Sequence, residues 1–552
     1  MKGSQVRAAF PDSDRLVVPA LLIASILQSL PPLLNAAGTQ SDAAVVGLQA
    51  MHLLRGEASW FLWGSGYQTS VDSFIAAGFF RLFGTTPLAL MLSAFVGYVA
   101  LTGFAYATLR RRFTPLSAGL LVTPLVFMAP PVHIYAFYPP RQASLTLLFA
   151  ALWALDGAPN ARAPAGRVAL GALLAGLACF ADPYALLFLP AVAVFVILIA
   201  TDAREPRAVV RRFATGLAGI AVGLVPFVLL SRSAGARHGV FQLDAAALGR
   251  HVKLLFGECL PYLLGTDVRR FVPGHGAVTW TAPPFFRAIQ MVGACSLVAG
   301  IVVGGVVSVV RRDARDARRL GAAGAVMLPV TLGAFALSVM AMDRLSARYL
   351  VAIVLMAPFA LSPVLRVLGR GAVAAMLAPY LVTIAVGGWL AYGDNVDGPR
   401  IVQKNGRAVD EQTLARALRA RGLRYGLADY WVSYRLTFLF HEDPILVPWH
   451  AALDRYPPYR RAADAERTLA YVYDPYWSEE DLAYRKEELS KGKGGFEPGF
   501  EEFRAGRYTV LVLRRARPGG LRVAGAHGRL NGELVTPPPD TTTHAQGDMH
   551  AL

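Results

Sequence analysis

Asp42 stands directly after the first long apolar run of the chain, in the stretch SDAAVVGLQAMHLLRGE, residues 41–57. The stretch is typical of an amphipathic helix, and an acid at its start has two possible roles. It can cap the helix by accepting hydrogen bonds from the first backbone N–H groups. It can also act as a general base, because the dipole at a helix start holds a carboxylate in its ionised form. The two roles are compatible, and both stay open from the sequence.

Four more charged residues fall where apolar runs begin or end. Asp72, in GYQTSVDSFIAAGFFRLFG, is a second acid in the same polar connection, either a reacting group or a solvated acid or cap. Arg141, in FYPPRQAS, opens an apolar run, and Asp182, in CFADPYALL, falls in an Asp-Pro pair that favours a turn role. Arg348, in SARYLVAIVL, enters an apolar run, where an arginine indicates function unless it is an interfacial anchor.

These residue types favour a group-transfer site. Arginine recognises phosphate because its planar fork pairs with two phosphate oxygens. An acid that deprotonates an acceptor, together with arginines that hold a phosphate leaving group, can carry out such a transfer. If membrane-spanning helices position the site, a lipid-linked donor can enter it sideways from the bilayer.

The composition of the chain is that of a polytopic membrane protein. Of its 552 residues, 55% are hydrophobic and only 16% are charged, whereas about a quarter are charged in a soluble domain. The net charge of +17 does not indicate a nucleic-acid partner, because the arginines cluster at the ends of apolar runs, where they set membrane orientation. The three cysteines are scattered and show neither a disulfide framework nor metal-ligand spacing.

Eleven apolar stretches reach or approach the roughly 20 residues that span a bilayer. We place them at 17–35, 88–109, 115–133, 142–155, 168–181, 184–201, 213–231, 288–310, 321–341, 349–365 and 371–391. Every second connection is rich in arginine, which predicts an N-terminus inside and a C-terminus outside. The sequence therefore predicts a mainly α, polytopic helical bundle with about 11 spans in the inner (plasma) membrane.

Three larger segments would then lie on the periplasmic or extracytoplasmic face: 36–87, 232–287 and 392–552. The first is rich in aromatic residues, so we expect it to rest on the membrane surface and to carry Asp42 there. In the third, the short apolar segments RYGLA, PILVP, TLAYVYD and YTVLVLRR alternate with polar helical stretches. This alternation predicts a small α/β domain over 392–515, after a transmembrane domain over 1–391. The Gly-, Pro- and Thr-rich residues 516–552 are expected to be disordered.

Several of these stretches together resemble a known family, the GT-C glycosyltransferases, in the branch of the protein O-mannosyltransferases and the lipid A aminoarabinose transferase. The resemblance covers most of residues 17–475 and is carried by SDAAVVGLQAMHLLRGE, GYQTSVDSFIAAGFFRLFG, DPYALLFLPAVAVF, SARYLVAIVL, RGLRYGLADYWVSYRLTF, ILVPWH and DRYPPYRRA. It implies a polyprenyl-phosphate sugar as donor and assigns the family's catalytic aspartate to Asp42. The family often has Asp-Glu there, whereas Ala43 follows here. Asp72 falls where related bacterial membrane proteins carry Glu. Arg348 and Tyr349 match the family's Arg-Tyr near the lipid phosphate.

The function that we infer is an inverting glycosyltransferase that moves a sugar from a polyprenyl-phosphate donor to an extracytoplasmic hydroxyl on a glycan, lipid or protein. The catalytic candidates are Asp42 and Asp72. The candidates for binding substrate and phosphate are Arg348, Tyr349, Arg141, Tyr67 and Asp182. No cofactor is implied, and the need for a divalent metal stays open. Two alternatives also stay open: a transporter or lipid flippase, and a non-catalytic membrane scaffold whose outer domain binds a polysaccharide.

Overall fold

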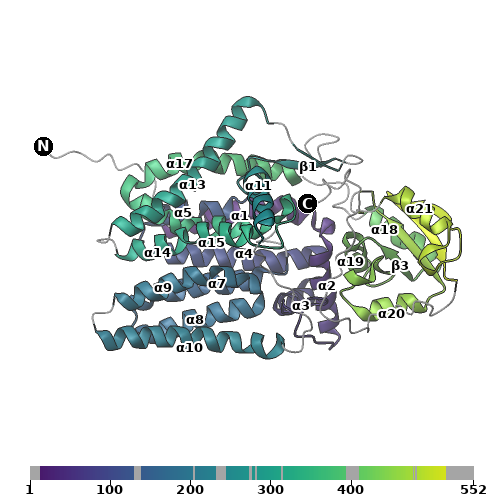
Figure 1. The fold of residues 1–552 in the computed structure, drawn as a ribbon, viewed down its shortest axis with the longest axis horizontal. Coiled ribbons are helices and arrows are strands. Elements are labelled where there is room, and N and C mark those ends of the chain that lie inside the picture. Colours follow the sequence, from purple (N-terminus) through teal and green to yellow (C-terminus); the bar gives the residue numbers. More distant parts are fainter. Residues whose placement is uncertain are drawn as a thin grey trace.

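A bundle of long apolar helices makes up most of the protein, and a small α/β domain lies beyond one of its ends (Figure 1). The computed structural model describes residues 13–129, 139–202, 205–231, 244–272, 276–279, 282–311, 315–392, 409–475, 478 and 481–516. The expected tail lies outside the described residues from 517 onward, as do the end of the predicted span 115–133 and residues 392–408 except Tyr392.

Eight helices in the described part are long and apolar enough to cross a membrane, by length and composition. They are α1 (Asp14–Leu34), α4 (Pro87–Arg110), α8 (Pro164–Ala181), η3 (Pro183–Phe188) with α9 (Leu189–Thr201), α10 (Pro206–Ser231), α13 (Pro284–Val310), α14 (Arg315–Ala325) with α15 (Met327–Ala336), and α17 (Ser362–Tyr392). Three shorter apolar helices pack among them: α5 (Pro115–Val126), α7 (Gln142–Asp156) and α16 (Val351–Ala360). Each predicted span overlaps one of these helices or helix pairs, so the polytopic helical fold is confirmed. The break expected between the last two spans occurs at Gly369, whose φ of 80° interrupts α17.

The two ends of the bundle differ in chemistry. At one end, the side chains of Arg111 and Arg112 pair with the buried carboxylate of Asp156, where α4 ends and α7 ends. At the end where α4 and α7 begin lie two further helices, α2 (Ser41–Leu54) and α3 (Val71–Phe83), between the bundle and the C-terminal domain (Figure 1). We call this the α2 end. The arginines that follow α4 and the candidate site therefore lie at opposite ends of the bundle, as the positive-inside pattern requires.

The connection 36–87 does not lie flat on a membrane surface as a whole. α3 does expose a row of large apolar side chains, namely Phe74, Ile75, Leu82 and Phe83. In α2, by contrast, every residue from Ser41 to His52 except Asp42 is buried. α2 packs against α3 on one side and against α19 (Tyr430–Leu439) of the C-terminal domain on another. The prediction of a surface helix is thus wrong for α2, because protein covers the face that lipid was expected to cover.

Between α10 and α13, the described residues form α11 (Ala245–Leu254), a π-helical turn η4 (Leu255–Cys259), α12 (Leu260–Leu263) and the antiparallel strands β1 (Arg269–Val272) and β2 (Gly276–Thr279). The turn packs against η5 (Arg344–Leu350), the 3-10 helix that precedes α16. This part of the predicted segment 232–287 therefore lies beside a segment that carries two candidate residues.

The C-terminal domain contains a five-stranded mixed sheet with the order β4-β3-β5-β7-β6. β3 (Tyr425–Ala428) is parallel to β4 (Ile445–Pro448) and to β5 (Thr468–Tyr473), whereas β7 (Tyr508–Arg514) is antiparallel to β5 and β6 (Glu501–Ala505). Besides α19, its helices are α18 (Val409–Ala420), α20 (Pro457–Ala465) and α21 (Leu482–Ser490). Four of the strands coincide with the four apolar segments named above, so the predicted α/β character is confirmed.

One hydrophobic core joins the C-terminal domain to α2 and α3. The ring of Phe438 on α19 lies over the ring of Phe80 on α3, with centroids 6.0 Å apart. Gly47 allows α2 to approach this closely, since a Cβ there would lie 2.7 Å from the Phe438 ring. The domain is therefore packed onto the α2 end rather than tethered to it.

Candidate active site

Asp42 occupies the second position of α2 and does not cap the helix. The N-cap is Gln40, and its side chain makes no capping hydrogen bond. The capping role that the sequence left open is thus wrong. The carboxylate of Asp42 is 36% exposed, unlike its buried neighbours in α2, and it stands where the helix dipole favours negative charge. Its presence needs another explanation than helix capping.

Two residues of the C-terminal domain hold the Asp42 carboxylate. The hydroxyl of Tyr430 donates a hydrogen bond to Oδ1, and Nη2 of Arg455 lies 3.4 Å from the same oxygen. Arg455 also donates through Nε to the Tyr430 hydroxyl at 3.0 Å and through Nη1 to the carbonyl of Gly64 at 3.2 Å. Burial and the neighbouring Asp42 raise the pKa of Tyr430 well above its ordinary value, so the hydroxyl stays protonated and donates.

Sequence reasoning missed both partners. Tyr430 lies in ADYWVSY and Arg455 in DRYPPYRRA, two stretches that contributed to the resemblance but whose individual residues received no role. Neither stretch shows a spacing that links it to Asp42, which precedes them by 388 and 413 residues.

Arg141 and Asp182 form an ion pair at the same end of the bundle. Nε of Arg141 lies 3.2 Å from Oδ2 of Asp182, and Nε2 of Gln68 donates to that oxygen at 2.7 Å. The other oxygen of Asp182 accepts from the backbone N–H of Tyr184 at 2.8 Å and so caps η3, in agreement with the favoured turn role. Asp182 thus combines a structural role with holding Arg141 in place.

Asp72 is buried, with 6% of its surface exposed. Its Oδ1 accepts from the backbone N–H of Ala143 at 3.0 Å, which places the carboxyl at the first turn of α7. Its Oδ2 is buried and has no hydrogen-bond partner among the described residues. Burial raises the pKa of Asp72 to about 7, against the opposing effect of the Ala143 N–H. Of the alternatives left open for Asp72, this geometry favours the cap.

Tyr67 precedes Gln68, the residue that donates to Asp182. Its side chain is half-exposed, and its pKa is raised by burial while Arg141 and Arg455 act on it in the opposite direction. Both arginines, together with Asp182 and Tyr349, are therefore close enough to Tyr67 to act on its charge.

Arg348 and Tyr349 lie in η5, one turn before the apolar helix α16. Nη2 of Arg348 donates to the Tyr349 hydroxyl at 3.3 Å, and the guanidinium lies 5.1 Å from the centre of the Tyr349 ring. The backbone carbonyl of Tyr349 accepts from the hydroxyl of Tyr184 at 3.3 Å, and Tyr184 follows Asp182 in η3. A chain of contacts thus connects Arg348 with Asp182.

All seven predicted residues therefore lie at the α2 end. Among them the structure pairs Arg141 with Asp182 and Arg348 with Tyr349, whereas Asp42 is held by Tyr430 and Arg455 of the C-terminal domain. No three His, Cys, Asp or Glu side chains in the described ranges are grouped as metal ligands. The arrangement offers a proton acceptor and several cationic forks, which suits transfer of a group from a phosphate.

The comparisons with known proteins find similarity in structure alone. No protein-family model and no curated protein sequence matches the chain. Among solved structures, ArnT from Cupriavidus metallidurans bound to undecaprenyl phosphate is similar with a TM-score of 0.53 and 12% identity, over 90% of this chain and 97% of ArnT. The Archaeoglobus fulgidus oligosaccharyltransferase in its apo form gives 0.45 and 12%, over 83% and 69%. This similarity shows that the chain has the fold of ArnT over most of its length.

Proposed function

We propose that the protein is a membrane glycosyltransferase that moves a sugar from a polyprenyl-phosphate donor to the hydroxyl of an extracytoplasmic acceptor. The observation that carries this proposal is the Asp42 carboxylate, which is partly exposed, does no capping and is held by Arg455 and Tyr430. The shared fold supports it, since ArnT was solved with undecaprenyl phosphate.

The transfer proceeds in one displacement. Asp42 accepts the proton of the acceptor hydroxyl as the acceptor oxygen forms a bond to the anomeric carbon. The bond between that carbon and the phosphate oxygen breaks, and polyprenyl phosphate leaves with the electron pair. Because attack and departure occur on opposite faces of the sugar, the anomeric configuration is inverted.

Arg141 and Arg348 stabilise the leaving phosphate, whose negative charge grows as the bond breaks. Asp182, which is itself held by Gln68, orients the guanidinium of Arg141, and the hydroxyl of Tyr349 orients the guanidinium of Arg348. We assign the half-exposed side chain of Tyr67 to contact with the donor. The lipid chain remains in the bilayer beside the bundle, which explains why the site is built at the end of membrane helices.

The test is to incubate the purified protein in lipid nanodiscs with a panel of polyprenyl-phosphate sugars, with and without a chelator, and to measure released polyprenyl phosphate. We expect release with one sugar of the panel when an acceptor is present, and release slower by about 10²-fold or more from Asp42→Asn. The chelator arm decides the need for a divalent metal. In vesicles that contain the protein, movement of labelled lipid from one leaflet to the other without release of polyprenyl phosphate would indicate a flippase. Binding of polysaccharide without either activity would indicate a scaffold.

A further inference from the structure

We propose that the C-terminal domain completes the active site, with Tyr430 as a positioning residue for Asp42 and Arg435 as the anchor that holds Tyr430 in place. This inference rests on the proposed function in so far as Asp42 is the base. The inference goes beyond the proposed function because it gives the C-terminal domain a part in catalysis.

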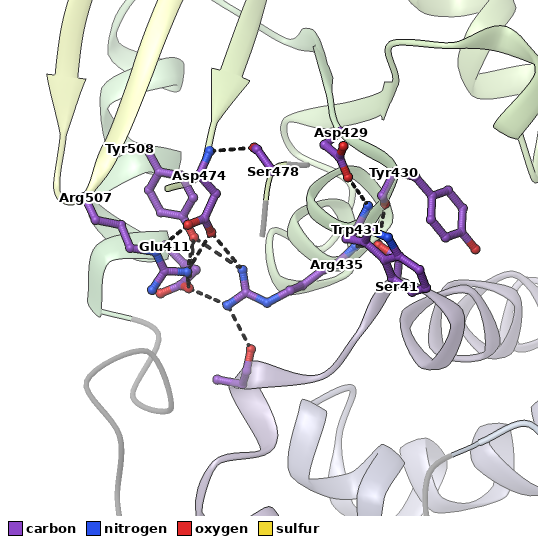
Figure 2. Close-up of polar contacts among 11 residues, drawn as sticks. Ser41, Glu411, Asp429, Tyr430, Trp431, Arg435, Asp474, Ser478, Arg507 and Tyr508 are labelled. Atoms are coloured by element: carbon purple, nitrogen blue, oxygen red, sulfur yellow. Dashed lines mark hydrogen bonds and ion pairs between the residues drawn. The ribbon is translucent and has the colours of Figure 1, made fainter. Parts of the chain in front are cut away.

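The anchor is a buried ionic network. Arg435 on α19 is fully buried, and its Nη2 pairs with Oε1 of Glu411 at 2.5 Å. Arg507 pairs with the same oxygen at 3.0 Å and with Asp474 at 2.8 Å, as Figure 2 shows. Two guanidinium groups thus face two carboxylates, and the hydroxyl of Tyr508 donates to Glu411 at 3.0 Å. A buried charge is tolerated only when it is paired and hydrogen-bonded in this way, so the network holds Arg435 in one orientation.

From this network Arg435 reaches out of its own domain. Its Nη2 donates to the backbone carbonyl of Ala37 at 3.2 Å, between α1 and α2. Its backbone N–H donates to Oγ of Ser41 at 3.3 Å, and Ser41 in turn donates to the backbone carbonyl of Tyr430 at 2.6 Å. Figure 2 shows Ser41 beside the first turn of α19. Three hydrogen bonds therefore join α19 to Ala37 and Ser41, which precede Asp42 in the chain.

These bonds determine where the Tyr430 hydroxyl points. Tyr430 begins α19, so joining the first turn of α19 to Ser41 places its hydroxyl against Oδ1 of Asp42. With Oδ1 held by Tyr430 and Arg455, the carboxylate cannot rotate freely, and its second oxygen is left to accept the proton. A base that is already held in its reactive orientation does not lose conformational entropy when the reaction begins. The shared hydrophobic core could dock the domain without the network, but would not orient Asp42.

The experiment compares Tyr430→Phe, Ser41→Ala and Asp42→Asn with the wild type and with Tyr473→Phe, a matched change on β5 away from Asp42. Three quantities are measured on the full chain: kcat and KM for the lipid donor, the thermal midpoint, and hydrogen exchange of the α2 amides. Tyr430→Phe keeps the buried ring. We expect a loss in kcat of roughly 10- to 100-fold, with KM changed by less than about threefold and the midpoint nearly unchanged.

Ser41→Ala tests the anchor by a measurement that does not depend on enzymatic activity. We expect exchange of the amides of residues 44–48 to rise by about fivefold or more, while amides in β5 and β7 keep their protection. Wild-type kcat in Tyr430→Phe, with Asp42→Asn inactive, would overturn the positioning role and leave the proposed function standing. Full activity in Asp42→Asn would overturn the base, and unchanged exchange in Ser41→Ala would then overturn the anchor as well.

Discussion

The hydroxyl of Tyr430 donates a hydrogen bond to Oδ1 of Asp42, joining residues that are 388 positions apart in the chain. The contact brings the last domain of the protein to the first connection of its membrane bundle. The candidate site is therefore assembled from the bundle and the C-terminal domain, and neither contains it alone. The predictions below test the parts of this assembly separately.

Arg348→Lys should reduce turnover of the lipid donor by about 10²-fold, because a point charge replaces a planar fork that holds two phosphate oxygens. The same loss is expected in Arg141→Lys. Steady-state release of polyprenyl phosphate measures both effects. Arg366→Lys, a change far from the α2 end, is the matched control and should turn over like the wild type. If lysine serves as well as arginine at position 348, that residue is an interfacial anchor and not a phosphate ligand.

Asp72→Asn should stabilise the protein increasingly as pH rises. Burial raises the pKa of Asp72 from 3.8 to about 7, so the folded protein keeps a proton that the unfolded chain loses. The stability that this proton provides is complete below pH 3.8 and falls away as pH rises toward 7. Asn loses no proton and still accepts from the Ala143 N–H. The thermal midpoint of Asp72→Asn minus that of the wild type should therefore be larger at pH 8 than at pH 5.

The control for this experiment is Asp481→Asn, the same substitution at an exposed helix cap. A difference that stays level from pH 5 to pH 8 would contradict the buried, protonated state of Asp72. Glycosyl transfer by Asp72→Asn should continue, since the cap geometry persists. Its loss, together with an active Asp42→Asn, would move the base from Asp42 to Asp72.

His52 and Glu442 should make the contact between α2 and the C-terminal domain depend on pH. Nδ1 of His52 lies 2.6 Å from Glu57 and Nε2 lies 2.6 Å from Glu442. Burial alone would lower the pKa of His52, but the two carboxylates raise it above 6.5. Burial alone would raise the pKa of Glu442, but hydrogen bonds from His52, Tyr459 and Arg55 lower it to about 2.

The signs of these shifts define a window. The contribution of His52 is present below pH 6.5 and lost as pH rises through its raised pKa, and that of Glu442 is present above pH 4.5 and lost as pH falls toward 2. Glu442→Gln should therefore cost more thermal stability at pH 5.5 than at pH 9. Glu487→Gln, which removes an exposed pair with Lys491, should cost little at either pH. An equal or larger cost of Glu442→Gln at pH 9 would contradict a charged His52.

The membrane orientation is a further prediction. Reporter fusions after residues 112 and 315 should read cytoplasmic, and a fusion after residue 400 should read periplasmic, because arginine-rich connections stay inside. In the structure, the arginines that follow α4 lie at the end of the bundle opposite to Asp42, in keeping with this orientation. A cytoplasmic reading after residue 400 would place the candidate site on the wrong face for an extracytoplasmic acceptor.

The elements of the fold could be predicted where a local pattern decides them. The spans are apolar over most of their length, and four strands of the C-terminal sheet are short apolar runs such as PILVP and YTVLVLRR. β6 was not predicted, because Glu501, Glu502 and Arg504 give it the composition of a solvated segment. It lies at the edge of the sheet, where charge is common and hydrophobic alternation is not needed.

The only site residues that could be predicted are those whose positions follow from the membrane topology. Asp42, Arg141, Asp182 and Arg348 all lie at ends of apolar runs, so the alternation of spans brings them to one face. Tyr430 and Arg455 contact Asp42 because a separate domain docks onto α2, and no hydrophobic periodicity in the sequence predicts that docking. The burial of Asp72 could not be predicted for a similar reason, because Asp72 is in contact with α7, which comes from another part of the chain.

The most direct test of the central claim is turnover of a polyprenyl-phosphate sugar by the wild type and Asp42→Asn in parallel, with thermal unfolding measured on both. Asn still offers an oxygen to Tyr430 and is not needed as a cap, so Asp42→Asn should fold and melt nearly like the wild type. It cannot accept a proton, and its rate of polyprenyl-phosphate release should fall by about 10² to 10⁴. A folded Asp42→Asn protein that turns over at the wild-type rate would contradict the assignment of Asp42 as the base.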